Sequence, residues 1–133
     1  MKPSKLIEAA FDALKNAHAP YSGYQVGAAL LCADGTVFSG CNVENASYGM
    51  TNCAERTAVF SAIATGHKSF TAIAIAASKE PTPFPCGACR QVLAEFCDPD
   101  FSVYIAKGDQ FETTTLGELL PHRFDINKDA SDD

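Results

Sequence analysis

Three cysteines and one glutamate form the most informative pattern in this chain. Cys53 precedes Glu55 by two residues, and Cys86 and Cys89 lie in the run PCGAC. Proteins bind zinc through thiolate and imidazole ligands in a tetrahedron, and a catalytic site keeps three protein ligands and one open position for water. The three thiols therefore predict a catalytic Zn²⁺ site, with Glu55 beside the open position to move protons without binding the metal. Such an arrangement suits metal-assisted hydrolysis.

The charge of this site requires a nearby cation. Three thiolates carry more negative charge than one Zn²⁺ neutralises, which would make the metal a poor activator of water. Arg56 follows Glu55 and Arg90 follows Cys89, and either guanidinium could donate hydrogen bonds to sulfur. We favour Arg56 as the group that offsets the charge, whereas Arg90 could equally form an ordinary ion pair on a solvated helix face.

Other interpretations of these residues predict different chemistry. A CxxC pair occurs in redox proteins, but a redox pair does not require a third cysteine before a glutamate on another helix. Structural zinc needs a fourth ligand, and none of the three histidines lies at a suitable spacing. Asn52 and Glu55 have the spacing of a capping box, so the carboxylate could simply cap its own helix. Beside an open zinc position we favour the catalytic role.

The predicted helices place the thiols at helix amino termini. One helix is expected from about Cys53 to Thr65, closed by Gly66, and a second covers PCGACRQVLAEF. Unpaired backbone N–H groups and the helix dipole at such termini favour thiolates. The first of these helices is apolar nearly all the way round, which indicates deep burial or a subunit contact.

The remaining pattern predicts the α/β fold class. An amphipathic helix covers residues 4–17, and QVGAALLC and TVFSGCN form two strands joined by the Asp34–Gly35 turn. TAIAIAA and FSVYIA are strands that alternate with the two helices, which implies right-handed parallel crossovers. We expect an edge strand at residues 112–115 and a short helix at residues 116–120. The result is a single three-layer αβα domain with a mixed five-stranded sheet and helices on both faces.

Length and composition set the limits of domain count, partners and compartment. With 133 residues, 47% of them hydrophobic, the chain fits one domain, expected at residues 1–126 and followed by an acidic, disordered tail at residues 127–133. The net charge of −6 and ten scattered basic residues argue against nucleic acid as a partner. We see no signal peptide or membrane span, and so expect a soluble cytoplasmic protein with reduced cysteines. Three of these are expected to be packing residues, namely Cys32, Cys41 and Cys97.

Four motifs carry a resemblance to a known family. CAER and PCGACRQV, together with YSGYQVGAAL and CNVENASYG, resemble the small zinc-dependent cytidine deaminases, specifically their three-cysteine, homotetrameric class. The similarity covers about residues 21–124. It implies hydrolysis of cytidine and 2′-deoxycytidine to uridine and 2′-deoxyuridine with release of ammonia, by attack of zinc-bound hydroxide on C4, a step of pyrimidine salvage. It further implies one Zn²⁺ per subunit on Cys53, Cys86 and Cys89, with Glu55 shuttling the protons.

The resemblance also implies a set of substrate-binding residues. Asn42 and Glu44 would hydrogen-bond the ribose hydroxyls, and the backbone at Ala54 would help to hold the pyrimidine. A carboxylate on the sugar would repel phosphate, which favours free nucleosides over nucleotides. Tyr24 stands where the family commonly has a phenylalanine that stacks on the pyrimidine. Its ring can still stack, but its hydroxyl must find a partner or stay wet.

Two further aromatic residues connect the resemblance to assembly. Phe124 matches an aromatic that closes over the base in a neighbouring subunit's site, and Tyr48 would likewise reach across. These matches, with the apolar helix after Cys53, imply a homotetramer with shared sites. A terminal aromatic such as Phe124 could instead pack on its own core.

Three rival functions differ in what they require. A sister deaminase that acts on an aminopyrimidine antibiotic would share the zinc core but would not need Asn42 and Glu44. A deaminase that edits polynucleotides would need clustered basic residues and a stacking platform. A non-catalytic structural-zinc module predicts that metal removal unfolds the chain and that Glu55→Gln changes only stability.

Overall fold

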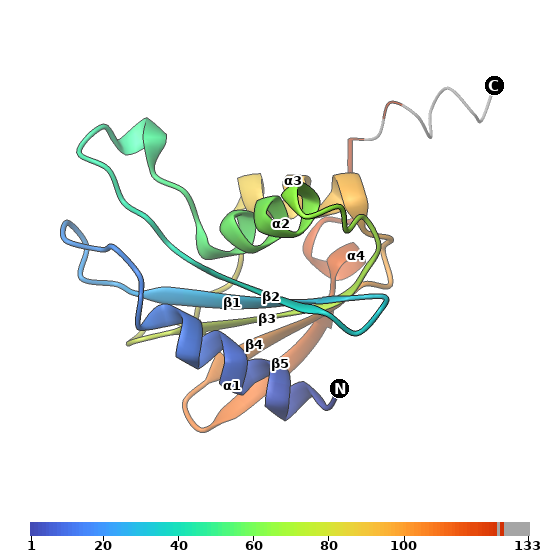
Figure 1. Cartoon of the computed structure of the whole chain (residues 1–133), viewed down its shortest axis with the longest axis horizontal. Coiled ribbons are helices and arrows are strands. Elements are labelled where there is room, and N and C mark those ends of the chain that lie inside the picture. The colour runs from blue at the N-terminus through green and yellow to red at the C-terminus, as the bar shows by residue number, and fades with distance from the viewer. Residues whose placement is uncertain (125, 127–133) are drawn as a thin grey trace.

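The fold is a mixed sheet with helices on both faces. Figure 1 shows the computed structural model, which describes residues 1–124 and 126, with α1 on one face of the sheet and α2 and α3 on the other. Along the chain the elements are α1 (Pro3–Leu14), β1 (Val26–Cys32), β2 (Val37–Cys41), η1 (Tyr48–Met50), α2 (Ala54–Ala64), β3 (Phe70–Ala77), α3 (Gly87–Phe96), β4 (Ser102–Lys107), β5 (Gln110–Thr115) and α4 (Leu116–Leu119). The predicted α/β class with a five-stranded mixed sheet is confirmed.

The two faces of the sheet carry different side chains because successive residues of a strand point to opposite sides. The face under α2 and α3 holds the larger side chains, including Leu30, Ile73, Ile75, Val103 and Ile105. The face under α1 is lined largely by alanine, namely Ala29, Ala72, Ala74, Ala76 and Ala106. The small side chains let α1 pack closely, and the larger ones form the main core beneath the two helices that carry the cysteines.

The strand order brings two helix amino termini to one edge of the sheet. The order is β2-β1-β3-β4-β5, with β1 antiparallel to both neighbours and β3 parallel to β4. Because β2 and β3 both run antiparallel to β1, they are parallel to each other. Helix α2 follows the carboxyl end of β2 and α3 follows that of β3, so both helices begin at the same edge. Ligand sites of open α/β sheets lie beyond such strand ends.

The ends of the elements show where sequence patterns were least informative. The edge strand β5 runs from Gln110, not residue 112, because Lys107 and Gln110 pair across a tight turn in which Gly108 has φ of 64°.

The longest helix that the structure describes is α1, with 12 residues. No helix in the described part of the chain is both long and apolar enough to cross a bilayer. The acidic tail predicted at residues 127–133 lies outside the described residues.

Gly40 on β2 allows α2 to lie very close to the sheet. A Cβ at this position would be 2.4 Å from the carbonyl oxygen of Ala54 and 2.5 Å from the backbone nitrogen of Ala58. Gly40→Ala should therefore push α2 outward and lower the free energy of unfolding by about 2–3 kcal/mol, measured by denaturant titration. Gly49→Ala is the control, because an added Cβ there meets no atom within 4 Å. Equal losses in the two variants would contradict this explanation.

Candidate metal and substrate site

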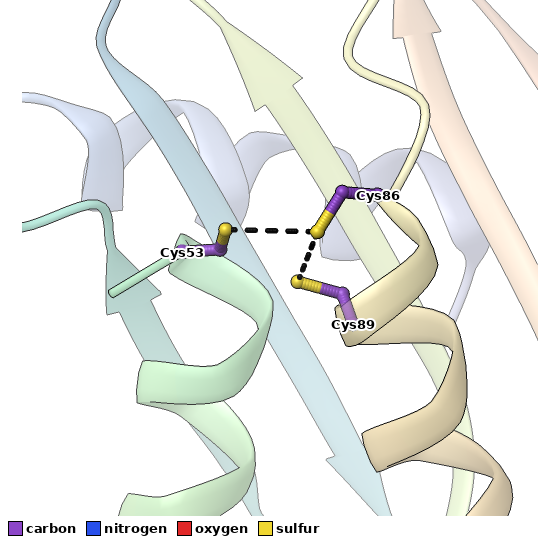
Figure 2. A group of neighbouring side chains, drawn as sticks. All are labelled: Cys53, Cys86 and Cys89. Atoms are coloured by element: carbon purple, nitrogen blue, oxygen red, sulfur yellow. Dashed lines mark hydrogen bonds between the residues drawn. The ribbon is translucent and has the colours of Figure 1, made fainter. Parts of the chain in front are cut away.

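The three predicted metal ligands converge between the amino ends of two helices. Figure 2 shows the sulfurs of Cys53, Cys86 and Cys89 directed toward one another from α2 and α3. Cys53 is the N-cap residue of α2 and Cys86 is the N-cap residue of α3. Cys89 is buried, Cys53 is half-buried and Cys86 is exposed. The predicted positions of these cysteines at helix amino termini are confirmed.

The spacing of the sulfurs fits a zinc ion. The Sγ atoms of Cys53 and Cys86 are 3.9 Å apart, those of Cys86 and Cys89 are 3.4 Å apart, and all three lie within 4.8 Å of one another. A tetrahedron with Zn–S bonds of about 2.3 Å has sulfurs about 3.8 Å apart. Among the described residues no fourth Cys, His, Asp or Glu belongs to this cluster. The donor set therefore fits one Zn²⁺ per chain with one open coordination position.

Arg56, the favoured cation, contacts the cluster. Its Nη2 donates a hydrogen bond to the Sγ of Cys53 over 3.3 Å. A hydrogen bond from the Cys89 thiol, supported by the Arg56 guanidinium, lowers the pKa of Cys53 to about 5, whereas the same bond and burial raise the pKa of Cys89. Hydrogen bonding in the metal-free site thus favours the thiolate form of Cys53, and zinc binding must displace the remaining protons.

Arg90 makes different contacts from those of Arg56. Its Nε donates to the carbonyl of Pro85 and its Nη1 to the carbonyl of Leu119, each over 2.8 Å. These bonds tie the start of α3 to the end of α4. Of the two guanidiniums considered from sequence, the one that reaches sulfur is therefore that of Arg56.

Glu55 is a buried carboxyl group beside the cysteines. It is the second residue of α2, and only 4% of its surface is exposed. The capping-box alternative would have its carboxylate accept from the backbone N–H of Asn52. That N–H instead donates to the carbonyl of Val43 over 3.0 Å, and no side chain caps α2. The contacts therefore do not support the capping role.

Burial changes the acidity of this carboxyl group. Removal from water, strengthened by the negative charge of Cys53, raises the pKa of Glu55 to about 7 in the metal-free protein. A group that titrates near neutrality can both accept and release a proton under ordinary conditions. The environment of Glu55 thus suits proton transfer.

The raised pKa predicts a stability change in Glu55→Gln. The unfolded chain releases this proton near pH 4.5 and the folded zinc-free protein near pH 7, so the wild-type free energy of unfolding falls as pH rises through that window. Glutamine does not titrate, so the zinc-free variant should not lose this stability. Its free energy of unfolding should exceed that of the zinc-free wild type by about 3 kcal/mol at pH 8 and should equal it well below the unfolded pKa. Denaturant titration of chelator-treated proteins at both pH values measures this difference. The exposed Glu95→Gln is the control, and equal stabilities of wild type and Glu55→Gln at pH 8 would contradict the prediction.

A cavity of about 320 Å³ opens next to the cysteines. This volume is in the range of small-molecule sites. Its walls come from the start of β1, the end of β2, the amino end of α2 and the segment before α3. The lining residues are Tyr24, Val26, Asn42, Thr51, Asn52, Cys53, Ala54, Glu55, Pro81, Thr82, Pro83, Phe84 and Cys86.

Three of the substrate-binding residues implied by the resemblance line this cavity, namely Tyr24, Asn42 and Ala54. The Asn42 side chain is buried, with its Oδ1 accepting from the backbone N–H of Val26 and its Nδ2 donating to the carbonyl of Tyr24, both over 2.8 Å. These two bonds fix the orientation of the amide. The second N–H of the Asn42 amide remains as a donor.

Glu44 lies in an adjoining cavity and not in the one beside the cysteines. This second cavity of about 350 Å³ is lined by Tyr21, Ser22, Glu44, Tyr48 and Thr51, and Thr51 lines both. The Glu44 carboxylate accepts from the backbone N–H groups of Tyr21 and Ser22 over 3.0 and 3.1 Å, and from the Ser22 hydroxyl. The bonds from Ser22 and Tyr21 lower the pKa of Glu44, so its carboxylate is ionised at neutral pH.

The aromatic residues expected to reach another subunit are exposed. Tyr48 is 76% exposed, with its ring edge-on to Tyr21, and Phe124 is 67% exposed. Phe124 lines neither cavity, and its exposure argues against packing on its own core. On α2, Phe60 is 48% exposed, so deep burial of this helix on all sides is wrong for the single chain, and the subunit contact is the alternative left.

Sequence reasoning missed one wall of the cavity beside the cysteines. The cavity is also lined by residues 81–84 and by the polar pair Thr51 and Asn52. No periodic pattern in the sequence marks these residues. The available signal was the run PTPFP directly before Cys86, because a proline-rich segment that leads into a metal ligand must pass close to the metal.

Comparisons with known proteins agree with this geometry. Residues 1–105 match the family model described as "Cytidine and deoxycytidylate deaminase zinc-binding region". A cytidine deaminase of Sporosarcina psychrophila is 52% identical over 93% of this chain and 92% of its own length. A crystal structure of cytidine deaminase from Burkholderia pseudomallei matches with a TM-score of 0.88 and 50% identity, covering 93% of this chain and 100% of that chain. A blasticidin-S deaminase of Bacillus cereus is 31% identical over 78% of this chain and 79% of its own length. The chain therefore belongs to the cytidine and deoxycytidylate deaminase zinc-binding family.

Proposed function

We propose that this protein hydrolyses cytidine and 2′-deoxycytidine to uridine and 2′-deoxyuridine, with release of ammonia. The observation that carries this proposal is the cluster of three cysteine sulfurs within 4.8 Å of one another, beside a buried glutamate in a cavity of about 320 Å³. The identity of 52% to a cytidine deaminase, against 31% to a blasticidin-S deaminase, favours the nucleoside over the antibiotic.

The chemistry follows from the positions of the cysteines, Glu55 and Arg56. Cys53, Cys86 and Cys89 would hold Zn²⁺, which when bound acts as a Lewis acid and lowers the pKa of water in the open position. Glu55, which lines the same cavity, would accept one proton from the attacking water and deliver it to N3 of the base, and would then pass the second proton of that water to the amine. The water oxygen would remain on C4, and the bond from C4 to the amine would break to release ammonia. Arg56 offsets the negative charge of the thiolates.

Substrate recognition would be divided between the two cavities. Tyr24 and Ala54 line the cavity beside the cysteines, where the pyrimidine would lie so that its C4 approaches the reacting water, and Asn42, which lines the same cavity, would bind a ribose hydroxyl. Glu44 lines the adjoining cavity, in which the ribose would lie with its hydroxyls donating to the ionised carboxylate. A phosphate on the ribose would be repelled by that charge, so free nucleosides are the favoured substrates.

Assembly and compartment are part of the same proposal. The exposure of Tyr48, Phe60 and Phe124 supports a homotetramer in which Tyr48 and Phe124 complete a neighbouring site. Light scattering that showed a fully active monomer would remove this part. The six cysteines are free, which agrees with a reducing compartment, and we propose a role in cytoplasmic pyrimidine salvage.

A substrate panel tests the function. The zinc-loaded protein is incubated with cytidine, 2′-deoxycytidine, cytidine monophosphate, blasticidin S and a cytosine-containing DNA strand, and loss of the aminopyrimidine is followed by ultraviolet absorbance. We expect turnover of the two nucleosides and little of the other three. Preferential turnover of blasticidin S would replace the proposal with the antibiotic deaminase, and no turnover of any substrate would favour a structural-zinc module.

A further inference from the structure

The hydroxyl of Tyr24 is bound within the protein. Tyr24 precedes β1 by two residues and is half-buried. Its hydroxyl donates a hydrogen bond over 2.5 Å to the carbonyl oxygen of Pro81. Burial, together with the charges of Glu80 and Glu55, raises the pKa of Tyr24, so the hydroxyl keeps the proton that it donates. The hydrogen-bond acceptor for the Tyr24 hydroxyl is therefore a backbone carbonyl in the segment between β3 and α3.

That segment forms one wall of the cavity and is held at both ends. Its residues 81–84 all line the cavity beside the cysteines. At the far end, the Arg90 guanidinium donates to the carbonyl of Pro85 over 2.8 Å, directly before the metal ligand Cys86. At the near end, the Tyr24 hydroxyl holds the segment through its hydrogen bond to the carbonyl of Pro81. Loss of this bond would release the start of the wall while Arg90 still held its end.

We propose that Tyr24 is a positioning residue whose hydroxyl holds the wall formed by residues 81–84 in place before substrate binds. This inference rests on the proposed function, and it concerns how the cavity is shaped and not the reaction step. A preformed wall lowers the entropy cost of substrate binding, because the segment is already ordered before the substrate arrives. Because the hydroxyl is used by Pro81, Tyr24 presents its ring and not its oxygen to the substrate.

Tyr24→Phe isolates the hydroxyl, because phenylalanine keeps the ring. A single hydrogen bond of this kind corresponds to about a 2- to 10-fold change in an equilibrium. We expect KM for cytidine to rise by about that factor while kcat and zinc content stay within about two-fold. Hydrogen–deuterium exchange should be faster in the peptide covering residues 80–86 and unchanged in β4. Tyr104→Phe is the matched control, because Tyr104 is a half-buried tyrosine on β4 that lines neither cavity, and it should leave KM and this exchange unaltered.

The results separate this inference from the proposed function. An unchanged KM and unchanged exchange in Tyr24→Phe would overturn the positioning role. A lower thermal midpoint with unchanged KM would also overturn it, because that result describes a purely structural bond. If the wild type does not deaminate cytidine, the proposed function fails first. The exchange measurement would then still decide whether the hydroxyl restrains the wall.

Discussion

Glu55→Gln should lower kcat for cytidine by at least about 1,000-fold while zinc stays bound at wild-type content. Positioned acid–base groups contribute about 10²–10⁴-fold to rate, and Glu55 is the buried carboxyl group that lines the cavity beside the cysteines. Glutamine has nearly the same shape but cannot carry a proton from water to the base. Ultraviolet turnover assays and elemental analysis of zinc, made on the same preparations, measure both quantities.

The same substitution should stabilise the zinc-free protein at pH 8, because glutamine lacks the buried carboxylate whose pKa is raised. Activity and stability would then move in opposite directions, which unfolding cannot explain and which is typical of residues kept for function. Glu95→Gln, on the exposed side of α3, should change neither activity nor zinc content. Turnover by Glu55→Gln within 10-fold of wild type would remove Glu55 from the mechanism.

Cys86→Ser should release zinc and abolish deamination without unfolding the chain. The Cys86 side chain is exposed, so the substitution removes a thiolate ligand at little cost in packing. The main core lies beneath α2 and α3, and a second cluster lies under α1, so most of the apolar burial is independent of the metal. We expect less than about one-tenth of wild-type zinc, no measurable turnover and an unchanged far-ultraviolet circular dichroism spectrum.

Cys41→Ser provides the control for the loss of a thiol. Cys41 is half-buried at the end of β2 and is not part of the sulfur cluster. It should retain zinc and activity. If Cys86→Ser unfolded the chain, or if it kept full zinc and activity, the catalytic zinc interpretation of the cluster would be contradicted.

Much of the fold and the centre of the site could be predicted from local patterns. Apolar runs such as TAIAIAA indicate buried strands, and the positions of Cys53 and Cys86 before apolar segments indicate helix starts. If the strands that these helices connect are parallel, both helices begin at the same edge of the sheet, and right-handed crossovers place them on the same face. The convergence of the sulfurs follows from these rules, which is why the metal cluster could be predicted from the sequence.

Other parts of the site depend on packing between segments that are distant in sequence. Nothing in the residues around Tyr24 indicates that its hydroxyl meets Pro81, which lies 57 positions away. The sequence favours Arg56 over Arg90 but contains no feature that separates them firmly, because each directly follows a glutamate or cysteine of the site. The hydrogen bond from Arg56 to Cys53 supports that preference. The exposure of Phe60 could not be read from composition, since an apolar helix can face a core or a partner.

The source of the oxygen atom that appears on C4 shows whether the reaction is a hydrolysis at the metal. Zinc-loaded protein is incubated with cytidine in water enriched in ¹⁸O, and uridine is analysed by mass spectrometry with ammonia measured in the same sample. We expect uridine that carries ¹⁸O at C4, formed in equal amounts with ammonia and only when zinc is bound. Uridine without the label, or turnover that persists after zinc removal, would contradict hydrolysis at the cysteine-bound metal.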